Sequence, residues 1–150
     1  WFTPSEDQSL ISLNTLKARI AGALGGRAAE QIVFGTSQVT SGAGGDLQQV
    51  ERMARAMVTQ FGMSSVGSIA IDEGGFMGPS YSDELGSSID DAIRSISDEC
   101  YLNALTLLMS NRECLDRIAD ELVEVETVPG DRLRQIVAEY TEIPEKLAAV

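Results

Sequence analysis

The sequence contains no histidine among its 150 residues. This absence excludes a Ser-His-Asp triad, a Cys-His pair and the imidazole ligands of an ordinary zinc site within the chain itself. Any chemistry in which the chain takes part must therefore use its carboxylates alone, or groups from outside these residues.

Positive charge, long apolar runs and paired cysteines are also scarce. The net charge is −12, and without a basic patch neither nucleic acid nor an anionic membrane is a suitable partner. No apolar run reaches the roughly 18 residues that indicate a membrane helix. Cys100 and Cys114 belong to no CxxC or Cys/His cluster, which favours buried free thiols in a reducing compartment over a disulfide.

What is present is the pattern of a globular, mainly α-helical protein. Apolar residues make up 43% of the chain and charged residues 23%, a balance that suits one domain with a core. The periodicity predicts a bundle of about five helices. The first, capped by Ser12 or Asn14 and ended by Gly35, reaches residue 34. Its buried stripe is expected to be Leu16, Ile20, Leu24, Ala28 and Ile32.

The second helix is expected over residues 46–61, ahead of an irregular segment, 64–79, that has room for a short strand or hairpin. Its predicted stripe is Leu47, Val50, Ala54, Met57, Val58 and Phe61. Met53 and Met57 are interpreted as core filler rather than as a binding stripe.

Three further helices complete the predicted bundle. The third begins between residues 82 and 88 and reaches about 110, with Ile89, Ile93, Ile96, Cys100, Ala104 and Leu107 inward. Asn111 can cap the fourth, whose inward residues are Leu115, Ile118, Leu122 and Val125. Thr127 can cap the fifth, with Pro129 in its first turn and Leu133, Ile136, Val137 and Tyr140 along its stripe.

Small residues interrupt the first helix, and a charged pair lies beside them. Because glycine in a helix costs up to about 1 kcal/mol relative to alanine, Gly25 and Gly26 suggest that another element packs close to the backbone there. Arg27 and Glu30 have the spacing of a surface ion pair. The alternative is a buried Arg27 that orients acidic groups near a functional site.

A glycine-rich loop, residues 36–45, leads directly into Asp46. The loop lacks the GK[ST] ending of a phosphate-binding loop, and an acidic residue at the helix start would repel phosphate. Asp46 is either a helix cap or first-turn acid worth about 0.5–2 kcal/mol, or a ligand or catalytic group that the loop brings into place.

Three blocks of the sequence resemble the peptidase domain of the FtsH family, membrane-anchored AAA+ zinc metalloproteases. They are "ARIAGALGGRAAEQIVFG", "TSGAGGDLQQVERMARAMVTQFGM" and "LVEVETVPGD". The similarity extends to about Tyr140, and the opening "WFTPSEDQSLIS" resembles cyanobacterial and plastid members in particular.

The resemblance implies a role for Asp46. In that family two histidines of an HExxH helix and a later aspartate hold zinc, and the HExxH glutamate is the general base. Asp46 matches the aspartate, although Gly45 stands where the family usually has asparagine. The HExxH helix would lie upstream of Trp1, so residues 1–143 are expected to be the C-terminal part of the peptidase domain, followed by a flexible tail, 144–150.

The implied parent is an ATP-dependent zinc endopeptidase, a hydrolase of protein quality control that degrades membrane and soluble proteins. It would be hexameric, would bind ATP and Mg in an upstream module, and would touch a membrane only through an upstream anchor. Its peptidase domain would face the plastid stroma or a bacterial cytoplasm. The isolated chain is expected to be inactive. The alternative is a non-catalytic helical scaffold derived from such a protease.

Overall fold

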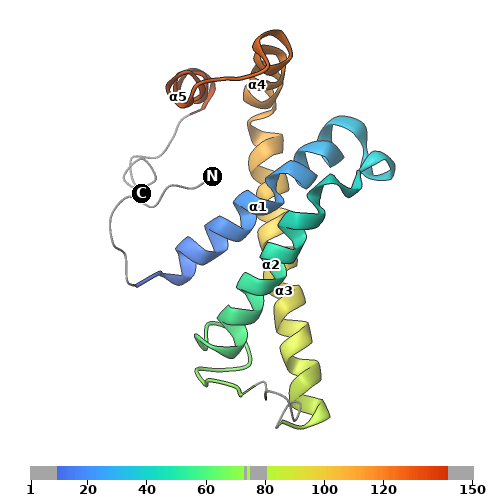
Figure 1. Ribbon diagram of the computed structural model, residues 1–150, viewed down its shortest axis with the longest axis vertical. Coiled ribbons are helices and arrows are strands. Elements are labelled where there is room, and N and C mark those ends of the chain that lie inside the picture. The colour runs from blue at the N-terminus through green and yellow to red at the C-terminus, as the bar shows by residue number, and fades with distance from the viewer. Residues whose placement is uncertain (1–9, 73, 75–80, 142–150) are drawn as a thin grey trace. The chain divides into compact units, whose positions relative to one another are not determined.

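A computed structural model describes residues 10–72, 74 and 81–141, and they form five α-helices and two short 3-10 turns without a strand (Figure 1). The elements are α1 (Leu13–Phe34), η1 (Thr36–Gln38), η2 (Ser41–Ala43), α2 (Gly44–Thr59), α3 (Asp83–Ser110), α4 (Arg112–Val125) and α5 (Gly130–Tyr140). The predicted mainly α fold is therefore confirmed. The chain divides into two compact units: Ile11–Leu105 is one, and the remaining residues belong to the other.

Helix α1 begins and ends where the sequence indicated. The Ser12 hydroxyl accepts a hydrogen bond from the Thr15 N–H at 3.2 Å, the bond of an N-cap. Gly35 ends the helix with a φ of +86°, a conformation that L side chains rarely adopt. Leu16, Ile20, Leu24 and Ala28 are buried as predicted, and Ile32 is half-buried.

Helix α2 starts two residues earlier than predicted and ends at Thr59. Val50, Ala54, Met57 and Val58 are buried, but the prediction was wrong for Leu47, which is 40% exposed, and for Phe61, which is 52% exposed. Leu47 lies at the edge of the stripe, where it lines a shallow groove between α2 and α3. Phe61 lies beyond the end of the helix, so helical periodicity no longer sets its direction.

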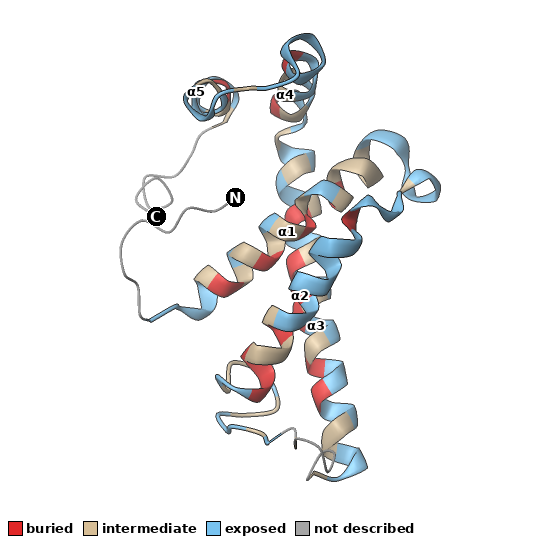
Figure 2. Ribbon diagram, in the orientation of Figure 1, coloured by how far each residue is buried: buried red, intermediate tan, exposed pale blue. Residues whose placement is uncertain are grey.

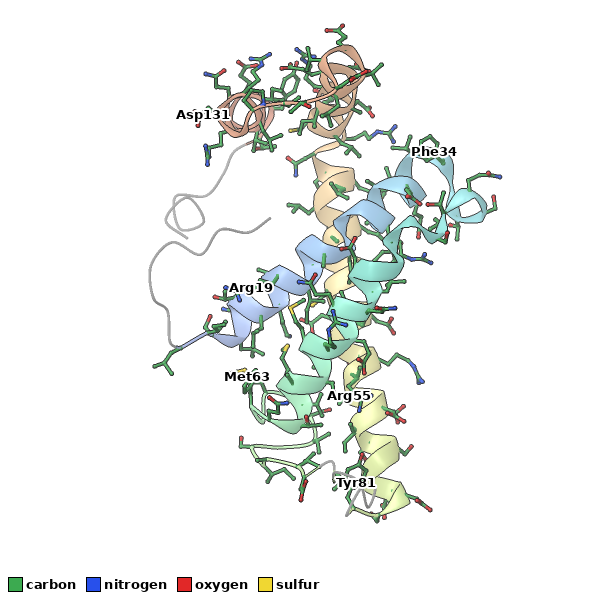
Figure 3. The ribbon with its side chains drawn as sticks, in the orientation of Figure 1. Arg19, Phe34, Arg55, Met63, Tyr81 and Asp131 are labelled. Atoms are coloured by element: carbon green, nitrogen blue, oxygen red, sulfur yellow. The ribbon has the colours of Figure 1, made fainter. Side chains whose placement is uncertain are left out.

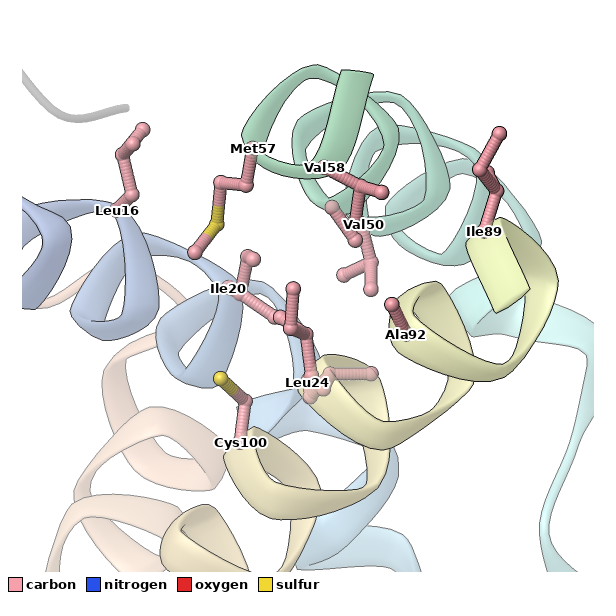
Figure 4. Close-up of a cluster of buried hydrophobic side chains, with 11 residues drawn as sticks. Leu16, Ile20, Leu24, Val50, Met57, Val58, Ile89, Ala92 and Cys100 are labelled. Atoms are coloured by element: carbon pink, nitrogen blue, oxygen red, sulfur yellow. The ribbon is translucent and has the colours of Figure 1, made fainter. Parts of the chain in front are cut away.

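The core of the unit formed by Ile11–Leu105 lies where α1, α2 and α3 meet (Figure 4). It consists of Leu16, Ile20, Leu24, Val50, Ala54, Met57, Val58, Ile89, Ala92, Ile96 and Cys100. Met53 packs against this cluster while Met57 is completely buried, which confirms both as core residues. This core anchors α2 from its second turn onward.

Polar contacts join α1 to α3 within the same unit. The Lys17 Nζ lies 2.7 Å from a carboxylate oxygen of Glu99. Near the other end of α1 the Tyr101 hydroxyl donates to the Gln31 side-chain oxygen at 2.6 Å. Together these contacts fix α1 against α3 at two points along its length.

The segment after α2 folds back on the helix it leaves. The Met63 N–H donates to the Met57 carbonyl at 2.8 Å, and the Ile71 N–H donates to the Thr59 carbonyl at 2.7 Å. Gly62 makes the turn with a φ of +59°, and a Cβ there would lie 2.9 Å from the Ser68 Cα. No strand occurs in 64–72 or 74, and the rest of the suggested hairpin lies outside the described residues.

Helix α3 follows its predicted face up to Ala104. Ile89, Ile96, Cys100 and Ala104 are buried and Ile93 is half-buried, but Leu107 is 65% exposed, contrary to the prediction. Leu107 lies near the C-terminal end of α3, beyond the core cluster of the first unit, and belongs to the other unit.

Helices α4 and α5 bury less of their apolar stripes than predicted. Asn111 occupies the N-cap position of α4 without a capping bond, and Pro129 rather than Thr127 precedes α5. Cys114 and Ile136 are buried and Leu115, Ile118 and Val137 are half-buried. The stripe residues that prove to be exposed, contrary to prediction, are Leu122, Val125, Leu133 and Tyr140.

Ion pairs centred on Glu121 join α4 to α5. Glu121, which is 9% exposed, accepts two hydrogen bonds from Arg132, at 2.7 and 2.9 Å, and one from Arg117 at 2.7 Å. The Arg132 hydrogen bonds, helped by both positive charges, hold the pKa of Glu121 below its ordinary value. Apolar periodicity does not report such a contact, because it treats Glu121 as a surface residue.

Candidate metal-binding site

Asp46 lies in the first turn of α2 and is exposed. Within the described part of the chain, its carboxylate makes no hydrogen bond or ion pair, and the N-cap position belongs to Ala43, which gives no side-chain capping bond. The interpretation of Asp46 as an N-cap is therefore wrong, and only the weaker first-turn interaction with the helix dipole remains. The carboxylate is free to bind something that approaches from outside.

The glycines that lead into Asp46 are not needed for unusual backbone angles at the helix start. Gly44 and Gly45 do not have positive φ values, and a Cβ on either would meet no described atom within 4 Å. Position 45 therefore has room for the asparagine that the FtsH family usually carries there. Figure 2 shows the first turns of α2 as exposed surface, whereas its buried residues begin with Val50.

Glu30 holds the loop before α2, a role that the sequence analysis missed. Its carboxylate accepts hydrogen bonds from the Thr40 N–H at 2.7 Å and from the Thr40 hydroxyl at 3.1 Å. The ion pair with Arg27, one of the two interpretations of this pair, is absent from the described residues, in which half-buried Arg27 has no polar partner. Thr40, a good capping residue directly before Ser-Gly, was the signal that could have identified the contact.

Two glycine positions in the small-residue stretch of α1 are open among the described residues, although Ala28 in the same stretch is buried and Ala21 and Ala23 pack against the core. A Cβ added at Gly25 or Gly26 would meet no described atom within 4 Å, so the close neighbour that the glycines suggested is not among these residues. At the end of the same helix Phe34 is 65% exposed (Figure 3). The sequence therefore carries the cost of helical glycine without a visible benefit.

Gly25→Ala should stabilise the 150-residue chain by about 0.5–1 kcal/mol, because alanine is the better helix former and its Cβ would meet no atom of the described residues. In a longer protein in which another element covers this face, the same change should be destabilising. Urea unfolding of the 150-residue chain and of the longer protein gives the sign of the change in unfolding free energy. Gly62→Ala is the control, because its positive φ and its clash with backbone predict destabilisation of the 150-residue chain and of the longer protein alike. If Gly25→Ala stabilised the two proteins equally, the idea that another element covers this face would be contradicted.

Zinc would find an incomplete ligand set in these residues. A catalytic zinc ion uses three protein ligands and a water molecule, but the described residues contain no group of three His, Cys, Asp or Glu side chains that could hold a metal. Asp46 fits the role of one carboxylate ligand, because it is exposed and unpaired within the described chain. The remaining ligands would have to come from elsewhere.

The two cysteines are not suitable as the remaining zinc ligands. Both are buried free thiols, as the sequence indicated. Burial, reinforced by the Glu99 charge, raises the pKa of the Cys100 thiol, and burial alone raises that of Cys114. Because a thiol binds zinc as the thiolate, these shifts oppose metal binding at neutral pH.

None of the described helices is long and apolar enough to cross a membrane. This agrees with the absence of a long apolar run in the sequence.

Comparison with known proteins identifies relatives along nearly the whole chain. The model of peptidase family M41 matches residues 1–136. The ATP-dependent zinc metalloprotease FtsH of Trieres chinensis is 46% identical over 97% of this chain and 24% of its own length. The chloroplastic ATP-dependent zinc metalloprotease FTSH 2 is 46% identical in Arabidopsis thaliana and 47% identical in rice, Oryza sativa subsp. japonica, over 96% of this chain in each case. Those two alignments cover 22% and 23% of the relatives, so the chain spans about a quarter of their length.

Proposed function

Because this chain belongs to peptidase family M41, we propose that it is part of the peptidase domain of an ATP-dependent zinc metalloprotease and supplies Asp46 as one zinc ligand. The observation that carries the proposal is the exposed carboxylate of Asp46, which is unpaired among the described residues and follows a braced loop. The relatives named as ATP-dependent zinc metalloproteases support the reaction class.

A zinc ion in such a site supplies Lewis-acid chemistry, activating water and polarising the scissile carbonyl. The contribution of this chain is a negatively charged ligand on a helix whose later turns are fixed in a core. The other ligands and the general base would come from an HExxH helix outside these residues, and that helix is the neighbour we assign to the open face at Gly25 and Gly26.

The proposal extends to the other parts of the longer protein, its assembly and its location. ATP and Mg would bind in another module of the longer protein, and a membrane anchor would also lie outside these residues. We place the protein in an oligomer, a hexamer, that acts on polypeptides in a plastid or a bacterium. The chloroplastic names of several relatives support the first of these locations.

Metal removal tests this function. In the longer protein, a zinc-selective chelator used with Mg in excess should abolish casein cleavage, and stoichiometric zinc should restore it. ATP hydrolysis should persist throughout, because another module performs it and keeps its Mg. The 150-residue chain serves as the control, and it should neither cleave casein nor bind zinc tightly, since one carboxylate is far short of three ligands.

Two results would contradict the proposal. Cleavage that survives complete removal of zinc, with Mg kept in excess, would exclude a zinc peptidase. A longer protein that binds no zinc and cleaves nothing, although it assembles, would identify the chain as the non-catalytic scaffold that the lack of histidine also allows.

A further inference from the structure

The first turn of α2 is not held by its own packing. Residues 44–49 are exposed, and the buried stripe of the helix begins only at Val50. No described atom lies within 4 Å of a Cβ placed at Gly44 or Gly45. The direction in which Asp46 projects therefore depends strongly on how the chain enters the helix.

The entering chain is fixed to α1 through the Glu30–Thr40 contact, meaning the two hydrogen bonds from Thr40 to the Glu30 carboxylate, at 2.7 Å from the N–H and 3.1 Å from the hydroxyl. An ionised carboxylate makes such bonds stronger than neutral acceptors do. Since Glu30 lies on α1, whose buried stripe is part of the core, this contact fixes the loop relative to the core.

From Thr40 onward the path to the helix is short and hydrogen-bonded. The Thr40 hydroxyl accepts from the Gly42 N–H at 3.2 Å, Ala43 is 8% exposed, and the Gly44 N–H donates to the Ser41 carbonyl. A Cβ on Gly42 would lie only 3.2 Å from the Thr40 hydroxyl oxygen. The glycine at position 42 therefore suits the contact, whereas those at 44 and 45 have no such neighbour.

We propose that Glu30 and Thr40 are positioning residues, which hold Asp46 where it can ligate a metal ion shared with another segment; this inference rests on the proposed function. Zinc–carboxylate distances are about 2.0–2.2 Å, and a site must be held to within about 0.5 Å to work. A freely moving first turn would not meet that tolerance. Glu30 acts through the backbone of the loop and does not itself bind the metal.

The test uses the longer protein with Thr40→Val, Thr40→Ser and Glu30→Ala. Valine has the shape of threonine without its hydroxyl, whereas serine keeps the hydroxyl and is the matched control. Zinc affinity by chelator competition, amide hydrogen exchange of residues 36–46 and melting temperature are measured for each. Thr40→Val and Glu30→Ala should weaken zinc binding about 10–100-fold and speed exchange at residues 40–43, while Thr40→Ser stays near wild type.

The melting temperature separates positioning from general stability, because both contacts are at the surface and should change it little. Unchanged exchange in Thr40→Val and Glu30→Ala would overturn the inference, and so would faster exchange with wild-type zinc affinity. A lowered melting temperature without a change in zinc affinity would also overturn the inference, because the contact would then only stabilise the fold. If the wild-type protein binds no zinc, the proposed function fails and this inference fails with it, whereas the exchange data still report whether the contact exists.

Discussion

Replacing Asp46 with alanine in the longer protein should lower casein cleavage by at least about 100-fold, since even the loss of a residue that only supports a zinc ligand costs 10–100-fold in affinity or activity. Bound zinc should fall in parallel. ATP hydrolysis should remain, because the proposed ATP site belongs to another module. The stripe that anchors α2 from Val50 onward is untouched by the change.

Asp46→Asn separates ligation from helix stabilisation. Asparagine has nearly the shape of aspartate, but its neutral amide is a poor ligand for zinc. As a ligand substitution, Asn should behave like Ala in zinc content and cleavage. Both variants should lose only about 0.3–1 kcal/mol of stability, the worth of a first-turn carboxylate on the helix dipole.

Asp83→Ala is the matched control, because Asp83 is another exposed acid in the first turn of a helix, α3. It should lose the same small stability and keep its zinc and its cleavage activity. An Asp46→Asn protein that retains zinc and cleaves casein at the wild-type rate would overturn the assignment of Asp46.

Periodicity predicted the parts of the fold that have one strong apolar stripe and a clear stop signal. Ser12 and Gly35 bound α1 as expected, and its stripe from Leu16 to Ala28 is buried. The prediction failed where burial depends on what lies opposite the stripe. Leu122 and Val125 have helical spacing, yet both are exposed, because no described element packs over the end of α4.

The candidate site was only partly predictable for a related reason. The sequence placed Asp46 beside a helix start, but composition could not tell a cap from an unpaired first-turn acid. Arg27 and Glu30 have the spacing of a helical ion pair, and spacing alone cannot show that Glu30 instead finds hydrogen-bond donors ten residues away. Contacts between a helix and the loop that follows it require the path of the backbone.

Ile20→Ala should cost about 2–5 kcal/mol, because it removes buried methyl groups and leaves a cavity where α1 faces α2 and α3. Ile20 is completely buried and lies among the core residues of the unit formed by Ile11–Leu105 (Figure 4). Since a whole domain has only about 5–15 kcal/mol of stability, this loss is a large fraction. Urea unfolding of the 150-residue chain measures it.

Two further variants serve as controls for the stability loss expected of Ile20→Ala. Ile20→Val removes one methyl group and should cost only about 0.5–1.5 kcal/mol, and Leu102→Ala, at a side chain 63% exposed, should cost little. If Ile20→Ala costs no more than Leu102→Ala, the three helices do not share the core described here. In the longer protein, at temperatures where Ile20→Ala remains folded, zinc should still bind, because the core positions α2 but supplies no ligand. Core loss and ligand loss then differ in kind: Ile20→Ala lowers the temperature at which cleavage fails, whereas Asp46→Ala removes cleavage at every temperature.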